Sequence, residues 1–241
     1  MPIAAGCHSV LSALTQEPQL NETKRALVTG TLEEAIARHE LDVAPEQVDQ
    51  LRRYCELLWA WNEKLNLTRH LDFEKFVARD LIDSMQLAEF LQSKERVLDI
   101  GSGGGVPGMV IAILRPDVKI WLSDSLEKKT NALTDMVREL ELPCKVINSR
   151  VQDLLKKRKF DTLVARAVGP MSKLLGWVAP HWSQFDRLLL IKGPRWVEER
   201  GEARHRGLLK TLELRKLKGY PMPGTESESV ILSIGAESNT S

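Results

Sequence analysis

The fold is decided by the stretch Val97-Leu98-Asp99-Ile100-Gly101-Ser102-Gly103-Gly104-Gly105-Val106-Pro107-Gly108. It begins as a short apolar run that contains one acid, and five glycines fall within its last eight residues. Residues 109–114 are apolar again and long enough for a helix. Glycine accepts positive φ and leaves room for a ligand beside the main chain, so this order predicts a strand, a tight turn and a helix. Such a unit opens a nucleotide-binding α/β fold.

The turn fits two classes of ligand. From Gly103 onward it matches G-x-G-x-x-G, the pattern of dinucleotide-binding domains, which alone is a weak signal. Asp99, however, lies two positions before Gly101, and a carboxylate facing the turn suits a cationic group such as the ammonium of S-adenosylmethionine. A pyrophosphate there would meet a second anion in a poorly screened cleft. The acid therefore favours the methyl donor, with Asp99, Gly101 and Gly103 as binding residues.

A second acid supports a nucleoside ligand of either class. Asp124 ends the apolar run 118–122, which follows the first helix of the unit. An acid at this point accepts hydrogen bonds from ribose hydroxyls in nucleotide-binding folds. Asp124 is therefore a candidate ribose-binding residue.

Composition indicates a globular protein. The chain has 241 residues, of which 43% are apolar and 28% charged, and its net charge is +1. This length suffices for one α/β domain with a smaller appendage, and so small a net charge leaves any RNA contact to local patches. The three cysteines, Cys7, Cys55 and Cys144, lack paired spacing, and no secretory signal precedes them, so we expect a cytoplasmic protein. We also expect a monomer with neither a metal site nor a membrane span.

The chain divides into three parts. Residues 1–30 mix short apolar pieces with polar residues and predict a poorly ordered extension. Residues 31–92 predict a helical N-terminal cap, with helices from Thr31, over about 45–66 and over 73–90. Thr31 and Glu34 form a candidate capping box for the first of them. Residues 93–241 form the sheet-containing domain.

Strands and helices alternate regularly after the glycine turn. Strands are predicted at 118–123, 145–148, 160–166 and 187–192, with helices near 106–115, 125–141, 150–157 and 171–180. A helix at 195–208 and strands at 211–218 and 229–234 follow. The link between the last two strands is too short for a crossover helix, so they should pair antiparallel. A mostly parallel α/β sheet with an antiparallel last strand is the Rossmann-like fold of S-adenosylmethionine-dependent methyltransferases.

An ordered set of motifs resembles the bacterial glucose-inhibited division protein B family, which methylates N7 of a guanine in 16S ribosomal RNA of the small subunit. The matching segments span roughly residues 48–234 and are Trp61-Asn62, Asn66-Leu67-Thr68, Arg79 to Ser84, the stretch 99–108, Ser123-Asp124-Ser125, Lys128-Lys129, Ser149-Arg150-Val151, Ala165-Arg166-Ala167 and Lys192-Gly193. Gln152 departs from the family, which often has an acid there.

The resemblance implies roles for particular residues. Gly101 and Val106 would line the pocket of the donor S-adenosylmethionine, Asp124 would hold its ribose, Val151 and Gln152 would border its adenine, and Arg166 would lie beside the reacting methyl group as the catalytic residue that guides the base. Open α/β sheets bind ligands at the carboxyl ends of their strands, and Gly101, Asp124 and Arg166 follow such ends. Two purely structural alternatives stay open: Asp99 could brace the turn amides, and Arg166 could serve a helix dipole or a surface ion pair.

Methylation at guanine N7 needs no general base, because that nitrogen carries a free lone pair at neutral pH. Alignment of donor and base can supply roughly 7–11 kcal/mol of the barrier. N7 is hidden in paired RNA, so the target should be unpaired or splayed out. Candidate phosphate contacts are Lys64, Arg69, Arg79, Lys192 and Arg195. A nicotinamide-dependent oxidoreductase, a methyltransferase acting on a small molecule or protein, and a non-catalytic RNA-binding protein remain as alternatives.

Overall fold

The computed structural model describes residues 30–236, so the predicted extension at residues 1–30 lies almost wholly outside the described residues. The cap begins with α2 (Leu32–Arg38), whose capping box between Thr31 and Glu34 is present as predicted. The next helix, α3, spans Pro45–Asn62 and ends earlier than expected. The reason is Asn62, whose side-chain oxygen accepts hydrogen bonds from the amides of Leu67 and Thr68 and turns the chain away.

The third cap helix is continuous but not uniform. It consists of α4 (Phe73–Lys75), a π-helical segment η2 (Phe76–Leu81) and α5 (Ile82–Ala88). A π-helix is rare and marks functional sites more often than chance would place it there. The π-helical segment carries Asp80, and Asp83 follows in the first turn of α5.

A seven-stranded sheet forms the centre of the molecule, with the order β3-β2-β1-β4-β5-β7-β6. The strands are β1 (Arg96–Ile100), β2 (Lys119–Asp124), β3 (Lys145–Asn148), β4 (Thr162–Arg166), β5 (Arg187–Lys192), β6 (Leu212–Pro221) and β7 (Glu228–Ala236). The first five pair parallel, whereas β7 lies between β5 and β6 and pairs antiparallel with both. The predicted fold class, including the antiparallel last strand, is confirmed.

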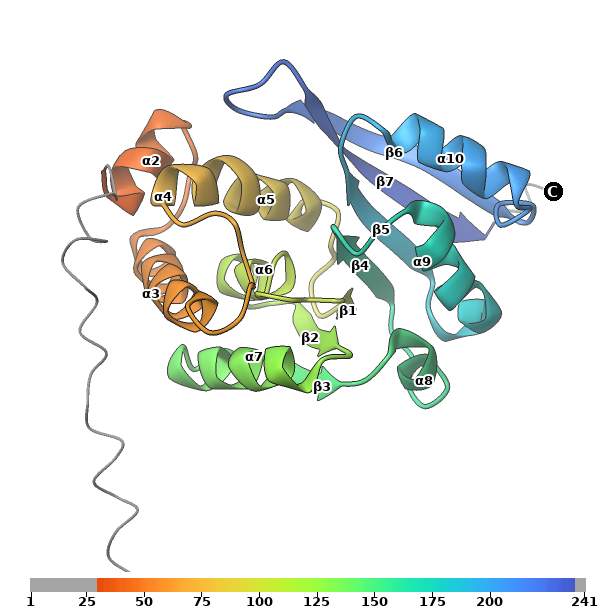
Figure 1. Ribbon diagram of the computed structural model, residues 1–241, viewed down its shortest axis with the longest axis horizontal. Helices are drawn as coiled ribbons and strands as arrows, with labels where there is room; N and C mark the ends of the chain where they lie inside the picture. The colour runs from red at the N-terminus through yellow and green to blue at the C-terminus, as the bar shows by residue number, and fades with distance from the viewer. Residues whose placement is uncertain (1–29, 237–241) are drawn as a thin grey trace, which may run out of the picture.

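Helices cover both faces of this sheet (Figure 1). The helices of the sheet domain are α6 (Gly108–Leu114), α7 (Glu127–Glu139), α8 (Val151–Leu155), α9 (Met171–Val178), the 3-10 helix η3 (Ala179–Gln184) and α10 (Trp196–His205). The cap helices, α6 and α7 pack on one face, and α8, α9 and α10 pack on the other. Alternate residues of β5 serve the two layers: Leu189 and Ile191 face the first, and Leu188 and Leu190 the second.

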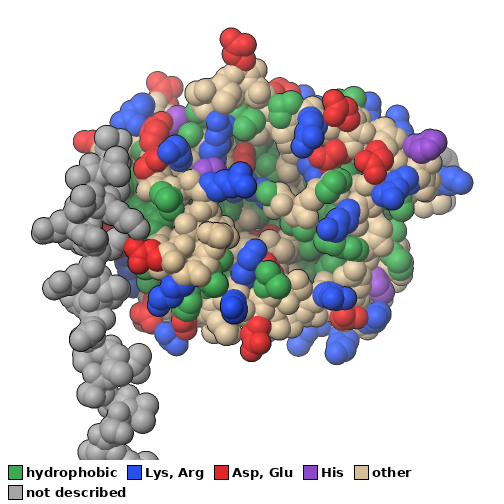
Figure 2. Space-filling model, viewed as in Figure 1, with side chains coloured by type: hydrophobic (Ala, Val, Ile, Leu, Met, Phe, Trp, Pro, Cys, Tyr) green, Lys and Arg blue, Asp and Glu red, His purple; other side chains and the backbone are tan. Residues whose placement is uncertain are grey.

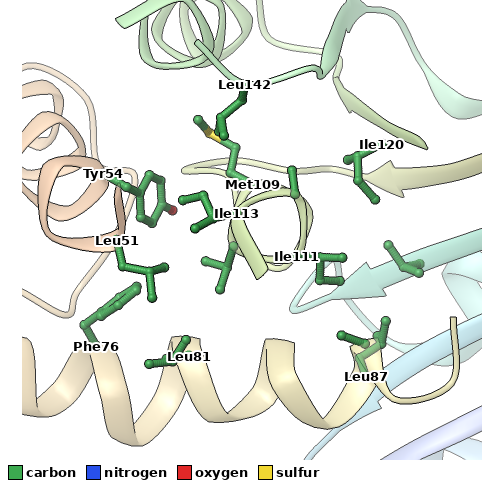
Figure 3. Close-up of a cluster of buried hydrophobic side chains, with 14 of the residues drawn as sticks. Leu51, Tyr54, Phe76, Leu81, Leu87, Met109, Ile111, Ile113, Ile120 and Leu142 are labelled. Carbon is green, nitrogen blue, oxygen red and sulfur yellow. The ribbon is translucent and has the colours of Figure 1, made fainter. Parts of the chain in front are cut away.

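The cap and the sheet share one hydrophobic core. Figure 3 shows Tyr54 of α3 beside Met109 and Ile113 of α6, and Phe76 of the third cap helix next to Leu51 of α3. All five side chains are buried. Burial of apolar surface contributes about 25 cal/mol per Å², so this shared core holds the cap firmly against the sheet domain.

No helix within residues 30–236 is both long and apolar enough to cross a membrane.

Candidate active site

The glycine turn after β1 adopts backbone angles that residues with a side chain rarely take. Gly101, Gly103 and Gly105 have φ values of +67°, +56° and +106°. Such angles are routine for glycine and rare for other residues. The cap closes on the same turn, since Tyr54 donates its hydroxyl to the carbonyl oxygen of Gly104 at 2.9 Å. The turn is thus held open toward the carboxyl edge of the sheet and supported from behind by α3.

Asp99 braces this turn from inside the protein. Its side chain is 1% exposed, and its Oδ2 accepts a hydrogen bond from the amide of Gly108 at 3.1 Å. Burial raises the pKa of the Asp99 carboxyl to about 7. Asp99 lines neither of the two cavities at the carboxyl ends of the strands, so the contact seen is the turn-bracing alternative, and a contact with a cationic ligand stays a prediction. The physical reason is that β1 points this side chain under the turn, toward the start of α6.

A first cavity of about 530 Å³ lies at the carboxyl ends of β1, β2 and β3. Four of the predicted donor-binding residues line it: Gly101, Asp124, Val151 and Gln152. The Asp124 carboxylate accepts hydrogen bonds from the amides of Leu126, at 2.9 Å, and Gly103, at 3.3 Å. These bonds fix the carboxylate at the cavity wall, between the two loops that frame it.

A second cavity of about 400 Å³ adjoins the first and lies between the glycine turn and the cap. Gly103, Val106 and Arg166 line it, as do residues of the loop after α3. The two cavities share three wall residues, Gly101, Lys129 and Ala167. Figure 2 shows this face hollowed near its centre, with Lys and Arg side chains around the hollow. Seven of the eight predicted donor-binding residues therefore line these two adjoining cavities, and only Asp99 lines neither.

Arg166, at the end of β4, is held by two carboxylates of the third cap helix. Its Nη1 donates to Asp80 Oδ1 at 2.6 Å, and its Nε lies 2.9 Å from Asp83 Oδ2. Burial by itself lowers the pKa of the Arg166 guanidinium, but Asp80 and Asp83 outweigh it and raise that pKa above its usual value. Arg166 is thus a permanently charged group, 17% exposed, in the wall of the second cavity.

The network continues on both sides of Arg166. His70 Nδ1 lies 2.9 Å from Asp80 Oδ2, and the Tyr220 hydroxyl donates to Asp83 Oδ1 at 2.7 Å. Two carboxylates thus flank a single guanidinium, so the cluster carries surplus negative charge whenever His70 is neutral. The ion-pair alternative for Arg166 is therefore present, but at the cavity wall and not on the outer surface.

The five predicted phosphate contacts fall into different environments. Arg69 is exposed and lines the second cavity, and Arg195 and Lys64 are exposed, with the Lys64 ammonium 5.3 Å from the Trp61 ring centre. Arg79 is half-buried, and its Nη1 has no hydrogen-bond partner among residues 30–236. The Lys192 side chain is 11% exposed. Its Nζ donates hydrogen bonds to Glu199 Oε2 and to the Gly169 carbonyl, both at 2.7 Å. Lys192 thus makes internal contacts, and its contact with phosphate stays a prediction.

Sequence reasoning missed several wall residues. Asp80 and His70 line the second cavity, Arg150 and Trp177 line the first, and Lys129 lies between them. Asp80, Lys129 and Arg150 stand inside the motifs that carry the family resemblance, which was the available signal. His70 and Trp177 lie outside those motifs, and no local pattern marks them.

The strand order, the glycine turn and the cavities at the carboxyl ends of the strands define a Rossmann-like, S-adenosylmethionine-dependent methyltransferase. Residues 47–222 match the family model GidB, described as rRNA small subunit methyltransferase G. The chain belongs to this family.

Relatives in other bacteria agree with the family match. Ribosomal RNA small subunit methyltransferase G of Rhodopirellula baltica is 53% identical over 178 residues, which are 74% of this chain and 77% of that protein. Its namesake in Chromobacterium violaceum is 40% identical over 174 residues, 72% of this chain and 83% of that protein.

Solved structures with low sequence identity share the fold. The WbdD protein, crystallised with the kinase inhibitor LY294002, is 13% identical, with a TM-score of 0.50 over 74% of this chain and 47% of that one. The Pyrococcus horikoshii protein PH0793 is also 13% identical, with a TM-score of 0.50 over 65% of this chain and 62% of that one. These similarities concern the fold alone.

Proposed function

We propose that this protein transfers the methyl group of S-adenosylmethionine to N7 of a guanine in 16S ribosomal RNA of the small ribosomal subunit, in the cytoplasm. The observation that carries the proposal is the pair of adjoining cavities, in a chain that belongs to the family of rRNA small subunit methyltransferase G. One cavity suits a nucleoside, and the other, next to it, holds the charged cluster around Arg166.

The residues present fit the methyl donor. In the first cavity, the Asp124 carboxylate offers acceptors for a ribose diol, and the apolar side chains of Leu126, Val151 and Trp177 suit a purine ring. In the second, the surplus carboxylate of the Asp80 and Arg166 cluster suits a cationic group. The unsubstituted backbone of Gly101 separates the two compartments, and a Cβ there would lie 3.1 Å from Val168. S-Adenosylmethionine, when bound, supplies an electrophilic methyl group.

Methyl transfer to N7 requires the protein to align the donor with the base and to balance the charge that develops on the base. Methylation leaves the guanine ring positively charged, so negative charge near the base favours the product-like state. Asp80 lines the second cavity and supplies such a charge. Arg166 retains N–H groups beyond those given to Asp80 and Asp83, and they can orient a base carbonyl oxygen. No proton has to be removed, so none of these residues needs to act as a general base.

The surface around the cavities suits a polyanion. Arg69, Lys129 and Arg150 line the cavities, and none of them has a carboxylate within salt-bridge distance in the described part of the chain. Unpaired cations are available for phosphates, which provide most of the affinity in nucleic-acid binding. These three residues, with Lys64 and Arg195, are the proposed RNA-contacting set.

The proposal is tested by methyl transfer to small ribosomal subunits that lack their native modification. Labelled S-adenosylmethionine is the donor, and reduction followed by aniline cleavage locates any 7-methylguanosine. A single cleavage site in 16S ribosomal RNA is the expected result. Donor binding without labelling of the RNA would contradict the substrate assignment, and labelling without aniline-sensitive cleavage would contradict the N7 position. Binding of NADH in place of S-adenosylhomocysteine would instead support an oxidoreductase.

A further inference from the structure

Two buried residues behind Arg166 make contacts that suggest a role in catalysis at a distance. Asp83 accepts from the Tyr220 hydroxyl on one oxygen and pairs with Arg166 Nε through the other. Neither Asp83 nor Tyr220 lines either cavity. Any effect of these residues on a bound ligand must therefore pass through Arg166.

The contacts restrict how the guanidinium can turn. Asp80 holds Nη1 and Asp83 holds Nε, so two edges of a planar group are fixed by separate carboxylates. The three side chains are only 17%, 4% and 13% exposed for Arg166, Asp80 and Asp83. Buried ion pairs contribute little net stability because desolvation offsets their attraction, and fixing a geometry is a better-supported use of them.

Tyr220 completes the arrangement from the far end of the sheet. It lies on β6, and it is 6% exposed. Burial raises the pKa of the Asp83 carboxyl, while the charge of Arg166 and the hydrogen bond from Tyr220 act to lower it. The hydroxyl therefore helps to keep Asp83 ionised and also fixes the direction in which its second oxygen points.

We propose that Asp83 and Tyr220 are positioning residues for methyl transfer, which orient Arg166 from behind without touching the donor or the base. This inference rests on the proposed function, and it assigns the third cap helix and β6 a part in it. It also explains why this buried cluster joins five separate segments: the loop after α3, η2, α5, β4 and β6.

The test compares Tyr220→Phe and Asp83→Asn with the unchanged protein in methyl transfer to small subunits. Loss of one hydrogen bond to a charged group should lower kcat about tenfold in Tyr220→Phe, with a larger loss in Asp83→Asn. Donor affinity, measured by calorimetry, should stay within about twofold. Ser172→Ala is the matched control, because it removes a hydroxyl that donates to Glu202 at 2.9 Å and lines neither cavity. Its kcat should not change.

A double-mutant cycle separates positioning from a merely structural role. An Arg166→Lys background lacks the planar guanidinium that Asp83 and Tyr220 are proposed to orient. Adding Tyr220→Phe to this background should therefore lower kcat by less than about twofold. An equal loss of kcat in both backgrounds, or unchanged kcat in both single variants, would overturn the inference. Failure of the unchanged protein to label the RNA would count against the proposed function instead. If Asp83→Asn does not fold, the isosteric Tyr220→Phe variant still decides the question.

Discussion

Arg166, at the end of β4, places a guanidinium in the wall of the second cavity, next to Asp80. Its two carboxylate partners come from the cap, so the charge that faces the second cavity is set by residues on another element. Asp124 and Asp99 show the same dependence on surroundings. Both are buried acids beside the glycine turn, yet one faces a cavity and the other faces the protein interior. Three predictions follow at this scale.

Arg166→Ala should slow methyl transfer far more than it weakens donor binding. In the proposed function this change removes the group that orients the base, and a small misplacement of reactants costs about a hundredfold in rate. Single-turnover transfer to small subunits and calorimetry with S-adenosylhomocysteine measure the two effects separately. Transfer at the unchanged rate would leave Arg166 with a structural role only.

Asp124→Ala should weaken binding of S-adenosylhomocysteine by roughly ten- to a hundredfold, because it removes charged acceptors from the cavity wall. Calorimetric titration is the measurement. Asp135→Ala provides the control, since it removes a surface carboxylate of α7 that pairs with Arg138 and lines neither cavity. Equal affinity in both variants would remove Asp124 from the binding site.

The raised pKa of Asp99 predicts a stability difference that depends on pH. The folded protein holds this proton up to about pH 7, whereas the unfolded chain releases it near the ordinary value of about 4. The contribution of Asp99 to stability is therefore present at low pH and is lost as the pH rises from about 4 to 7, at up to about 1.4 kcal/mol per pH unit. The measurement is urea unfolding of the unchanged protein and of Asp99→Asn. As the pH rises over this range, the free energy of unfolding of the unchanged protein should fall relative to that of the variant. A difference in the free energy of unfolding that stays constant from about pH 4 to 7 would contradict the prediction.

At the scale of an element, α6 depends on the absence of a side chain at its first residue. A Cβ on Gly108 would overlap the Leu122 side chain and lie 2.7 Å from Asp99 Oδ2. The close approach allows the Gly108 amide to reach Asp99 and fixes the start of the helix against β2. The glycine is thus required by packing, because an added Cβ has no room there.

Gly108→Ala should lower the free energy of unfolding by about 1–3 kcal/mol through overpacking. Gly201→Ala in α10 is the contrasting change, because nothing lies within 4 Å of its added Cβ. Alanine is a better helix former than glycine, so that variant should gain about 0.5–1 kcal/mol. Urea unfolding at fixed pH measures both. Equal stabilities for the two variants would show that the approach of α6 to β2 is not tight.

Some elements were predictable because their signals are local. The strands at 145–148 and 187–192 agree with the sequence reading residue for residue, since each is a short β-prone run with distinct boundaries. The end of α3 was missed because an asparagine side chain, and not a helix-breaking residue, stops the helix. The position of β7 between β5 and β6 was also missed, because strand order depends on long-range pairing that no single segment encodes.

At the scale of the whole molecule, the residues that line the first cavity could be predicted, whereas the charged cluster around Arg166 could not. The wall residues follow strand ends, which a parallel sheet brings to one edge. Arg166 and Asp80, by contrast, are 86 residues apart in sequence and meet only when the cap packs on the sheet. The contact of Lys192 with Glu199 is closer in sequence, but it also forms only when the following helix, α10, packs beside the end of β5. The predicted boundary between the cap and the sheet domain, at residues 92 and 93, stays a prediction, because side chains from both parts pack in one hydrophobic core.

The charge distribution over the molecule predicts how RNA binding responds to salt. Arg69→Ala should weaken binding to small subunits and reduce the slope of log affinity against log salt concentration by about one, the loss of one phosphate contact. Donor affinity should not change. Arg215→Ala is the control, because Arg215 lies on the edge strand β6, pairs with Glu213 and lines neither cavity. An identical slope for Arg69→Ala and the unchanged protein would exclude Arg69 from the RNA contact.

The hydrogen bond from the Tyr54 hydroxyl to the Gly104 carbonyl limits how far α3 can move from the glycine turn. A lid that swings over its ligand needs a hinge and a loosely packed inner face, and here α3 is tied to the glycine turn and its inner face is buried. A movement of α3 away from the second cavity would break this bond and expose buried apolar side chains, so we expect ligands to enter and leave without a displacement of α3.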